Sequence, residues 1–105
     1  MENLVFIEIL RRGYKLNENI FYYKTKNKKE VDFILKKENK IKELIQVCYE
    51  TENREAKERE IRALLEAAKE LKCNNLLVIT SDFEDEEKIK GKKIKFIPLW
   101  KWLLS

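Results

Sequence analysis

The stretch from Glu30 to Tyr49 constrains the fold more than any other part of the chain. It contains two runs of alternating side chains, separated by a polar link over Lys36–Lys40 in which Asn39 suits a turn. Side chains in a strand alternate between its two faces, and in both runs apolar residues fall on both faces. Strands of this kind are usually buried on both sides. The stretch therefore predicts a β-hairpin near the centre of a sheet.

Asp32, Gln46 and Cys48 interrupt the apolar character of this hairpin. Gln46 and Cys48 are two residues apart and share one row of the second strand, and an aspartate in the middle of a strand is disfavoured without a purpose. A purely structural interpretation is also open for each residue. Asp32 would pair with a lysine of the neighbouring 24–29 turn, Gln46 would bond to the backbone, and Cys48 would act as a small hydrophobe. The pattern predicts either a polar site or three structural residues.

The first helix is predicted over residues 2–12, where a wide apolar face ends in two arginines and is followed by Gly13. Glu8 interrupts that face. It either pairs with Arg11 or Arg12 one turn further on, or contributes an acid to a site.

The rest of the chain supplies further elements in a regular order. The long helix has a clear apolar stripe, with Thr51 or Asn53 as its predicted N-cap and Asn74 as the residue predicted to close it. The predicted elements are a strand over 20–25, the hairpin over 30–49, a helix over 51–72, a strand over 76–80, an acidic loop over 81–87, a basic loop over 88–95, a last strand around 94–97 and a short helix from Pro98. This α-β-β-β-α-β order predicts an α/β sandwich, with a mixed sheet flanked by helices and a right-handed crossover. We expect a single domain over residues 1–105.

Composition excludes several chemistries. The chain has no histidine, which removes Ser-His-Asp and Cys-His machinery and histidine-bound zinc. Cys48 and Cys73 have no metal-type spacing and suit a reducing cytosol. Neither a signal peptide nor a membrane-spanning run is found, so we expect a cytoplasmic protein with no membrane partner. The Lys- and Glu-rich composition is compatible with a thermophile source, and the net charge of +4 permits contact with a polyanion.

Five segments carry a family resemblance across nearly the whole chain: ENLVFIEILRRG, KKEVDFILKK, IKELIQVCYE, REIRALLEAAKEL and IPLWKWLL. In this order they resemble the C-terminal domain of unknown function of archaeal and bacterial P-loop (AAA-type) ATPases. The placement of Glu8, Asp32 and the Gln46–Cys48 triplet also resembles a PD-(D/E)XK core, which implies the restriction-endonuclease-like fold. A GxxxxGK[ST] motif is absent, so we expect the chain to be either an excised domain or a stand-alone or split relative.

The nuclease resemblance implies a site for Mg²⁺ or Mn²⁺ at Glu8, Asp32 and Gln46. Such an ion is held by oxygen ligands and activates water for phosphodiester hydrolysis. Two positions depart from the family pattern. Gln46 replaces an acid, and Cys48 replaces the lysine that stabilises the anionic transition state. A substitute cation from the second helix would be Lys57 or Arg54, and we select Lys57.

Two functions from different classes follow. The first is a nuclease-like domain that binds DNA, with weak or lost metal-dependent phosphodiester hydrolysis. The second is a catalytically inert interaction domain that docks a P-loop ATPase module or forms a homodimer. The lysines at 24–29 and 88–95 either contact phosphates or are solvated turns. At least one residue of the Trp100–Trp102 pair is expected to pack the last helix onto the sheet. A third function, with Cys48 as a nucleophile, is disfavoured because a histidine to activate it is missing.

Overall fold

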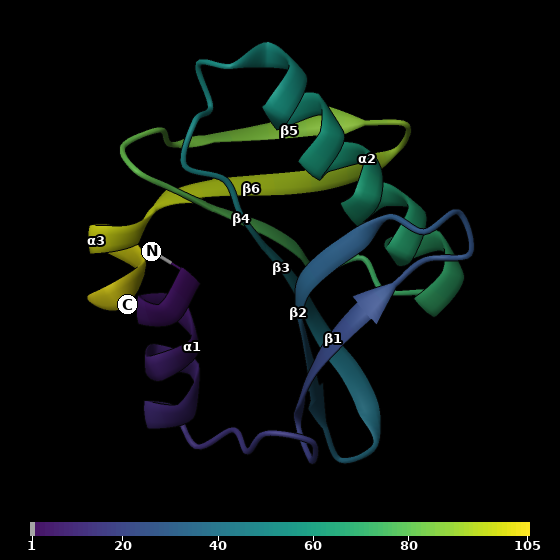
Figure 1. Cartoon of the computed structure of the whole chain (residues 1–105), viewed down its shortest axis with the longest axis vertical. Coiled ribbons are helices and arrows are strands. Elements are labelled where there is room, and N and C mark those ends of the chain that lie inside the picture. Colours follow the sequence, from purple (N-terminus) through teal and green to yellow (C-terminus); the bar gives the residue numbers. More distant parts are fainter. Residues whose placement is uncertain (1) are drawn as a thin grey trace.

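The computed structural model describes residues 2–105 and contains three helices and six strands in that range. Their bounds are α1 Glu2–Arg11, β1 Ile20–Lys24, β2 Glu30–Lys37, β3 Lys40–Val47, α2 Arg54–Leu71, β4 Leu76–Thr80, β5 Asp85–Ile89, β6 Lys92–Pro98 and α3 Leu99–Leu103 (Figure 1). The predicted helices and strands therefore form, within a few residues of their expected bounds. Within residues 2–105, no helix has both the length and the apolar character that crossing a membrane requires.

The strands form one mixed sheet in the order β1-β2-β3-β4-β6-β5. β1, β2 and β3 form an antiparallel meander, whereas β3, β4 and β6 run parallel to one another. The chain passes from β3 to β4 through α2, as the sequence predicted for a helical crossover. The mixed α/β class is thereby confirmed.

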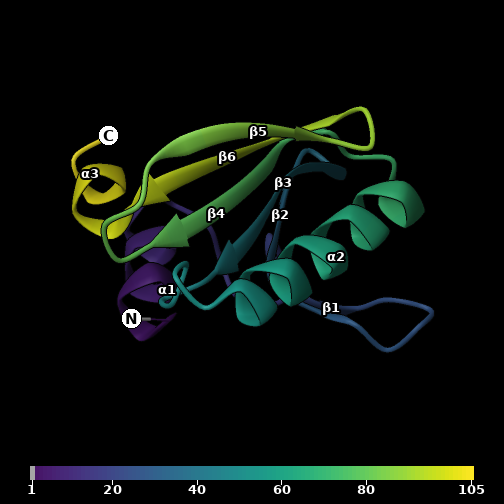
Figure 2. The ribbon, with the colours of Figure 1, turned by 90° about the horizontal axis from the view of Figure 1, so that it is seen from above.

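The two faces of the sheet carry separate cores. α2 packs on one face through residues that include Leu64 and Ala68, against strand residues such as Val78 and Phe96. α1 and α3 pack on the other face, where Trp102 is buried and Trp100 is 60% exposed. Figure 2 shows α2 running along the sheet, away from α1 and α3. One tryptophan of the predicted pair thus packs the last helix onto the sheet, as expected.

Local backbone chemistry sets the ends of the elements. The Asn53 side chain accepts a hydrogen bond from the Ala56 N–H over 3.1 Å, so Asn53 is the N-cap of α2. The C-cap is Lys72 in the left-handed conformation, so the prediction that Asn74 closes the helix was wrong. The β2–β3 hairpin turns at Glu38 and Asn39, which both have positive φ, as a tight two-residue turn requires.

β5 was not predicted. Residues 81–87 and 88–95 were expected to be an acidic and a basic loop, but Asp85–Ile89 pairs antiparallel with β6. Lys90 and Gly91, both at positive φ, form the two-residue turn between these strands. An edge strand stays largely in water and can carry many charges, so it lacks the apolar alternation by which strands are recognised.

Candidate functional site

The hydrogen bonds between β2 and β3 change in kind at the end of the pair that lies away from the hairpin turn. From Phe33 and Ile45 toward the turn, the two strands pair in a ladder with one register shift, between Leu35 and Lys36. Beyond that point, side chains supply the bonds. The Gln46 Oε1 accepts the Asp32 N–H over 2.8 Å, and the Asp32 Oδ2 accepts the Val47 N–H over 2.8 Å. Asp32 and Gln46 are therefore brought together, as the hairpin predicted.

Both ends of the Gln46 amide are occupied. Its Nε2 donates to the carbonyl oxygens of Glu30, over 3.0 Å, and of Glu60 in α2, over 3.3 Å. The residue is 0% exposed. The interpretation of Gln46 as a buried amide bonded to the backbone is thus confirmed. A metal ion at its oxygen would have to compete with the Asp32 N–H for that oxygen.

A second carboxylate, that of Glu60, stands near Asp32. Burial raises the pKa of Asp32 to about 6, the hydrogen bond from Val47 opposes this shift, and the charges of Glu2 and Glu30 add to it. Burial, followed by the charge of Asp32, raises the pKa of Glu60 to about 7. Carboxylates with pKa values raised by burial and by neighbouring negative charges are typical of functional sites, although structural networks also produce them.

The alternative role for Asp32 does not hold. The ion pairs formed within residues 2–105 do not join Asp32 to a lysine of the 24–29 turn. Its carboxylate instead bonds to the backbone of β3.

A cavity of about 250 Å³ lies next to Glu60. Its lining residues are Lys28, Lys29, Glu30, Arg59, Glu60 and Ala63. Basic and acidic side chains thus face the same space, between the β1–β2 turn and α2. At its edge, the Glu30 carboxylate contributes most to raising the pKa of Tyr22 to about 12.

Glu60 was not singled out from the sequence because it is one of several charged residues between Arg54 and Arg62 of α2. The spacing of residues along the helix could have identified Glu60. Glu60 is one turn before Ala63 and Leu64, which are both buried, so it lies at the border of the apolar stripe. A carboxylate in that position faces the sheet.

Glu8 is engaged elsewhere. It is 6% exposed and accepts hydrogen bonds of 2.8 Å from both Arg11 and Arg12, which lower its pKa to about 2. The predicted ion pair with one of these arginines therefore forms with both. Arg12 also donates to the carbonyl oxygen of Trp102 over 2.7 Å and lies over the indole ring, 4.4 Å from its centroid. Glu8 thus belongs to the contact between α1 and α3, and it would have to release two guanidinium groups to bind a metal.

Lys57, the predicted substitute cation, lies between α2 and β5. Its Nζ forms an ion pair of 2.8 Å with Glu87 and lies over the rings of Phe83 and Phe96, 4.7 Å and 5.0 Å from their centroids. The lysine is therefore held by a carboxylate and two aromatic faces.

Cys48 is buried, at 4% exposure, which agrees with its interpretation as a small hydrophobe. Burial contributes most to raising the pKa of its thiol, followed by the charge of Glu60, while Lys57 acts in the opposite direction. The thiol is neutral at ordinary pH. Arg54, the other candidate cation, is 90% exposed and pairs with Glu58 over 3.2 Å.

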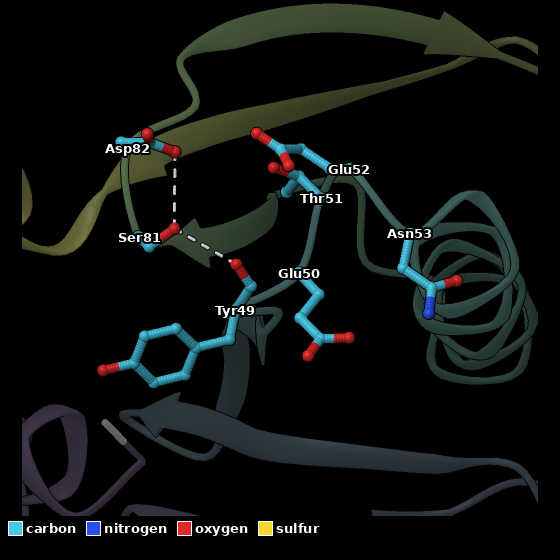
Figure 3. Close-up of a pocket in the computed structure, with 7 residues that line it drawn as sticks. All are labelled: Tyr49, Glu50, Thr51, Glu52, Asn53, Ser81 and Asp82. Atoms are coloured by element: carbon cyan, nitrogen blue, oxygen red, sulfur yellow. Dashed lines mark hydrogen bonds between the residues drawn. The ribbon is translucent and has the colours of Figure 1, made fainter.

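A larger cavity, of about 540 Å³, lies where the parallel strands β3 and β4 end (Figure 3). It is lined by Tyr49, Glu50, Thr51, Glu52, Asn53, Ser81 and Asp82, and the Ser81 hydroxyl donates to the Tyr49 carbonyl over 3.1 Å. Ligands often bind at this edge of an α/β sheet. Here, however, acids line the cavity without a basic side chain among the described lining residues. Between residues 2 and 105, no three His, Cys, Asp or Glu side chains are grouped closely enough to hold a metal ion.

The Asp32–Glu60 region is therefore the better candidate for contact with a phosphate. It combines two carboxylates of raised pKa with a neighbouring cavity whose lining includes Lys28, Lys29 and Arg59. The larger cavity presents only negative charge to an anion.

Comparison with known proteins places the chain in a family. An uncharacterized protein of Methanocaldococcus jannaschii, MJ1544, is 52% identical over 111 residues, which cover 100% of this chain and 24% of that protein. The chain thus spans about a quarter of the length of the curated relative it matches. No solved structure matched the chain. Residues 1–102 match a domain of unknown function, DUF4143, which occurs at the C-terminus of AAA-type ATPases. The chain belongs to this DUF4143 family.

Proposed function

We propose that this domain binds nucleic acid at the cavity beside Asp32 and Glu60, on a restriction-endonuclease-like scaffold whose metal-dependent hydrolysis is weak or lost. The observation that carries the proposal is the lining of that cavity, in which Lys28, Lys29 and Arg59 stand beside Glu30 and Glu60. Lysine and arginine side chains supply most of the affinity of proteins for the phosphate backbone.

The two carboxylates are of the ligand type that binds a divalent cation. Oxygen donors from Asp32 and Glu60 are the ligands that Mg²⁺ prefers, and a cation would stabilise the charged forms that burial disfavours in both groups. Asp32, predicted as a metal ligand, stays in this set, and Glu60 joins it. A bound ion would activate water and offset the charge that develops on the phosphate.

Two features of the site weaken hydrolysis of a phosphodiester. The Gln46 oxygen already accepts the Asp32 N–H, and Cys48 supplies a buried, neutral thiol where the nuclease pattern has a lysine. Loss of one electrostatic donor costs roughly 10²–10³ in rate, so binding survives such changes better than catalysis does.

The test measures binding of a labelled DNA duplex by fluorescence anisotropy over a range of salt concentrations. Arg59→Ala and Lys29→Ala should weaken binding and reduce its salt dependence, because each removes one phosphate contact. Lys69→Ala, on an exposed part of α2, is the matched control. Equal binding by all four proteins would refute the assignment of this cavity.

The second candidate function, docking onto an ATPase module, has its own observation. The outer face of α1 exposes Leu4 at 52%, Ile7 at 59% and Leu10 at 39%. Apolar stripes of this kind are unusual on a helix that faces only water. Most of the length of MJ1544 lies outside the matched region, so a longer chain of this kind has a further part to dock. Docking through this stripe should be insensitive to salt, unlike DNA binding.

A further inference from the structure

The edge of the sheet formed by β5 has backbone groups free for pairing. Ile89 and Lys92 flank the two-residue turn between β5 and β6, and residues in that position form a hydrogen-bonded pair. Hydrogen-bonded and non-bonded pairs alternate along an antiparallel ladder. The backbone N–H and C=O of Lys88 and Glu86 therefore point away from β6.

A side-chain bond supports this orientation. The Glu86 N–H donates to the Asp85 Oδ1 over 2.8 Å, so it is not directed at β6. Lys88 carries no comparable side-chain cap in the part of the chain that the structure describes. β5 is the last strand of the sheet, so the Lys88 backbone faces open space.

A groove of about 450 Å³ runs between this strand and α2. Ile61 and Leu65 of α2 and Ile89 of β5 form its apolar lining. A side chain that entered the groove would leave water and meet these three residues, which favours an apolar group.

The rim of the groove carries an excess of positive charge. Arg54 pairs with Glu58, and Lys57 pairs with Glu87. Arg62 and Lys90 also line the groove, and neither belongs to an ion pair within residues 2–105. Two positive charges therefore remain for an acidic ligand.

We propose that this groove binds an extended segment of a partner protein, which adds to β5 as a further strand. Its main chain would pair with Lys88, its apolar side chains would enter the groove, and acidic residues beside them would meet Arg62 and Lys90. A strand in which apolar and acidic residues lie two positions apart has this chemistry, because side chains two apart point to the same face and all of these would turn toward the groove.

A second copy of this chain fits the edge less well. Figure 1 shows that α2 begins beyond the outer edge of β5, so the helix overhangs the edge. A copy paired through its own β5 about a two-fold axis would bring a second α2 to the same side of the sheet. A single strand needs only the space of the groove.

The experiment titrates the isotope-labelled domain with a short synthetic peptide in which leucine and glutamate alternate at every second position, with threonine between them, and follows backbone amide resonances. The β5 amides, with Lys88 first among them, should shift, and the Lys88 amide should become protected from hydrogen exchange. The same peptide with lysine in place of each glutamate should bind at least about tenfold more weakly, because it meets Arg62 and Lys90 with like charge.

Two variants of one residue isolate the strand pairing. Lys88→Pro removes the outward N–H and leaves the ladder to β6 intact, since that N–H does not face β6. Lys88→Ala keeps the N–H and removes only the side chain. Peptide affinity should fall at least about tenfold in the proline variant and stay within about threefold of wild type in the alanine variant. The β6 amide resonances report whether each variant remains folded.

Three results of the peptide titrations would overturn the proposal. They are the absence of β5 shifts, equal binding of the glutamate and lysine peptides, and undiminished binding by a folded Lys88→Pro variant. Concentration-dependent broadening of the β5 resonances without peptide would also overturn it, because a second copy would then occupy the edge.

Discussion

The side-chain oxygen of Gln46 accepts the backbone N–H of Asp32 over 2.8 Å, so a side chain of β3 takes the place of a backbone acceptor toward β2. The amide nitrogen of the same side chain reaches the carbonyl oxygens of Glu30 and Glu60. One buried amide therefore joins two strands and a helix, and it does so beside the candidate site.

Gln46→Ala should lower the free energy of unfolding by about 3 kcal/mol. The substitution leaves the Asp32 N–H without its acceptor and opens a cavity in a fully buried position. Urea unfolding followed by circular dichroism measures the loss. Gln46→Glu is the shape-matched control, because it keeps an oxygen and removes the donor. A loss below about 1 kcal/mol for alanine would mean that the contacts contribute little.

Stability should fall as the pH rises from about 4 to about 7. The pKa values of Asp32 and Glu60 are raised in the folded state, from 3.8 to about 6 and from 4.5 to about 7. The folded state therefore binds more protons than the unfolded chain in this window, and the stabilisation present below it is lost as the pH rises. Glu8, with its pKa lowered to about 2, acts in the opposite sense, but below pH 4.5.

The change in pH dependence should amount to about 1–3 kcal/mol, because the two groups interact and are partly hydrated. Urea unfolding at about pH 5 and about pH 8 measures it. Glu60→Gln removes one titrating group and should flatten the profile. An unchanged profile in this variant would show that Glu60 titrates normally.

Arg12→Ala should destabilise the fold more than Arg11→Ala. Both arginines bond to Glu8, but Arg12 also holds the Trp102 carbonyl and ring, and its side chain is 30% exposed against 68% for Arg11. We expect a loss of about 1–2 kcal/mol for Arg12 and less than about 0.5 kcal/mol for Arg11. Thermal unfolding of the two variants compares them directly. Equal losses would contradict a role for Arg12 in joining α1 to α3.

Cleavage of supercoiled plasmid with Mg²⁺ or Mn²⁺ should be slow in the wild type and absent in Asp32→Asn. Asparagine preserves the shape of the side chain and removes the charge that would hold the ion. A labelled branched duplex provides a second substrate. Equal cutting by both proteins would assign the activity to a contaminant, and fast cutting by the wild type would show that Gln46 and Cys48 do not impair the site.

The periodicity of apolar residues predicted the buried helices and strands of this fold but did not predict β5 at the edge of the sheet. The β2–β3 hairpin and α2 were recognisable because burial imposes apolar alternation on a strand and an apolar stripe on a helix. β5 was not recognisable, because its outer edge and one of its faces meet water. Charged residues such as Glu86 and Lys88 suit that environment, and they would suit a loop equally well. The feature that distinguishes a strand from a loop here is the two-residue turn at Lys90–Gly91, and not the sequence of β5 itself.

The candidate site was likewise predicted only in part. Asp32 and Gln46 were predicted to meet because strand pairing follows from a short turn. Glu60 comes from α2, and its approach to Asp32 depends on how that helix crosses the sheet, which local sequence does not encode. Glu8 shows the converse, since its arginine partners lie one turn away and were predicted from spacing alone.

The mixed bonding of β2 to β3 also implies an order of assembly. Near Glu38 and Asn39 the rungs join residues close in sequence, and they can form from the turn outward as soon as the hairpin folds. At Asp32 the rungs depend on Gln46, whose amide is completed only when the Glu60 carbonyl arrives with α2. We therefore expect the hairpin to form first near its turn and its far end, at Asp32 and Gln46, to be completed when α2 docks.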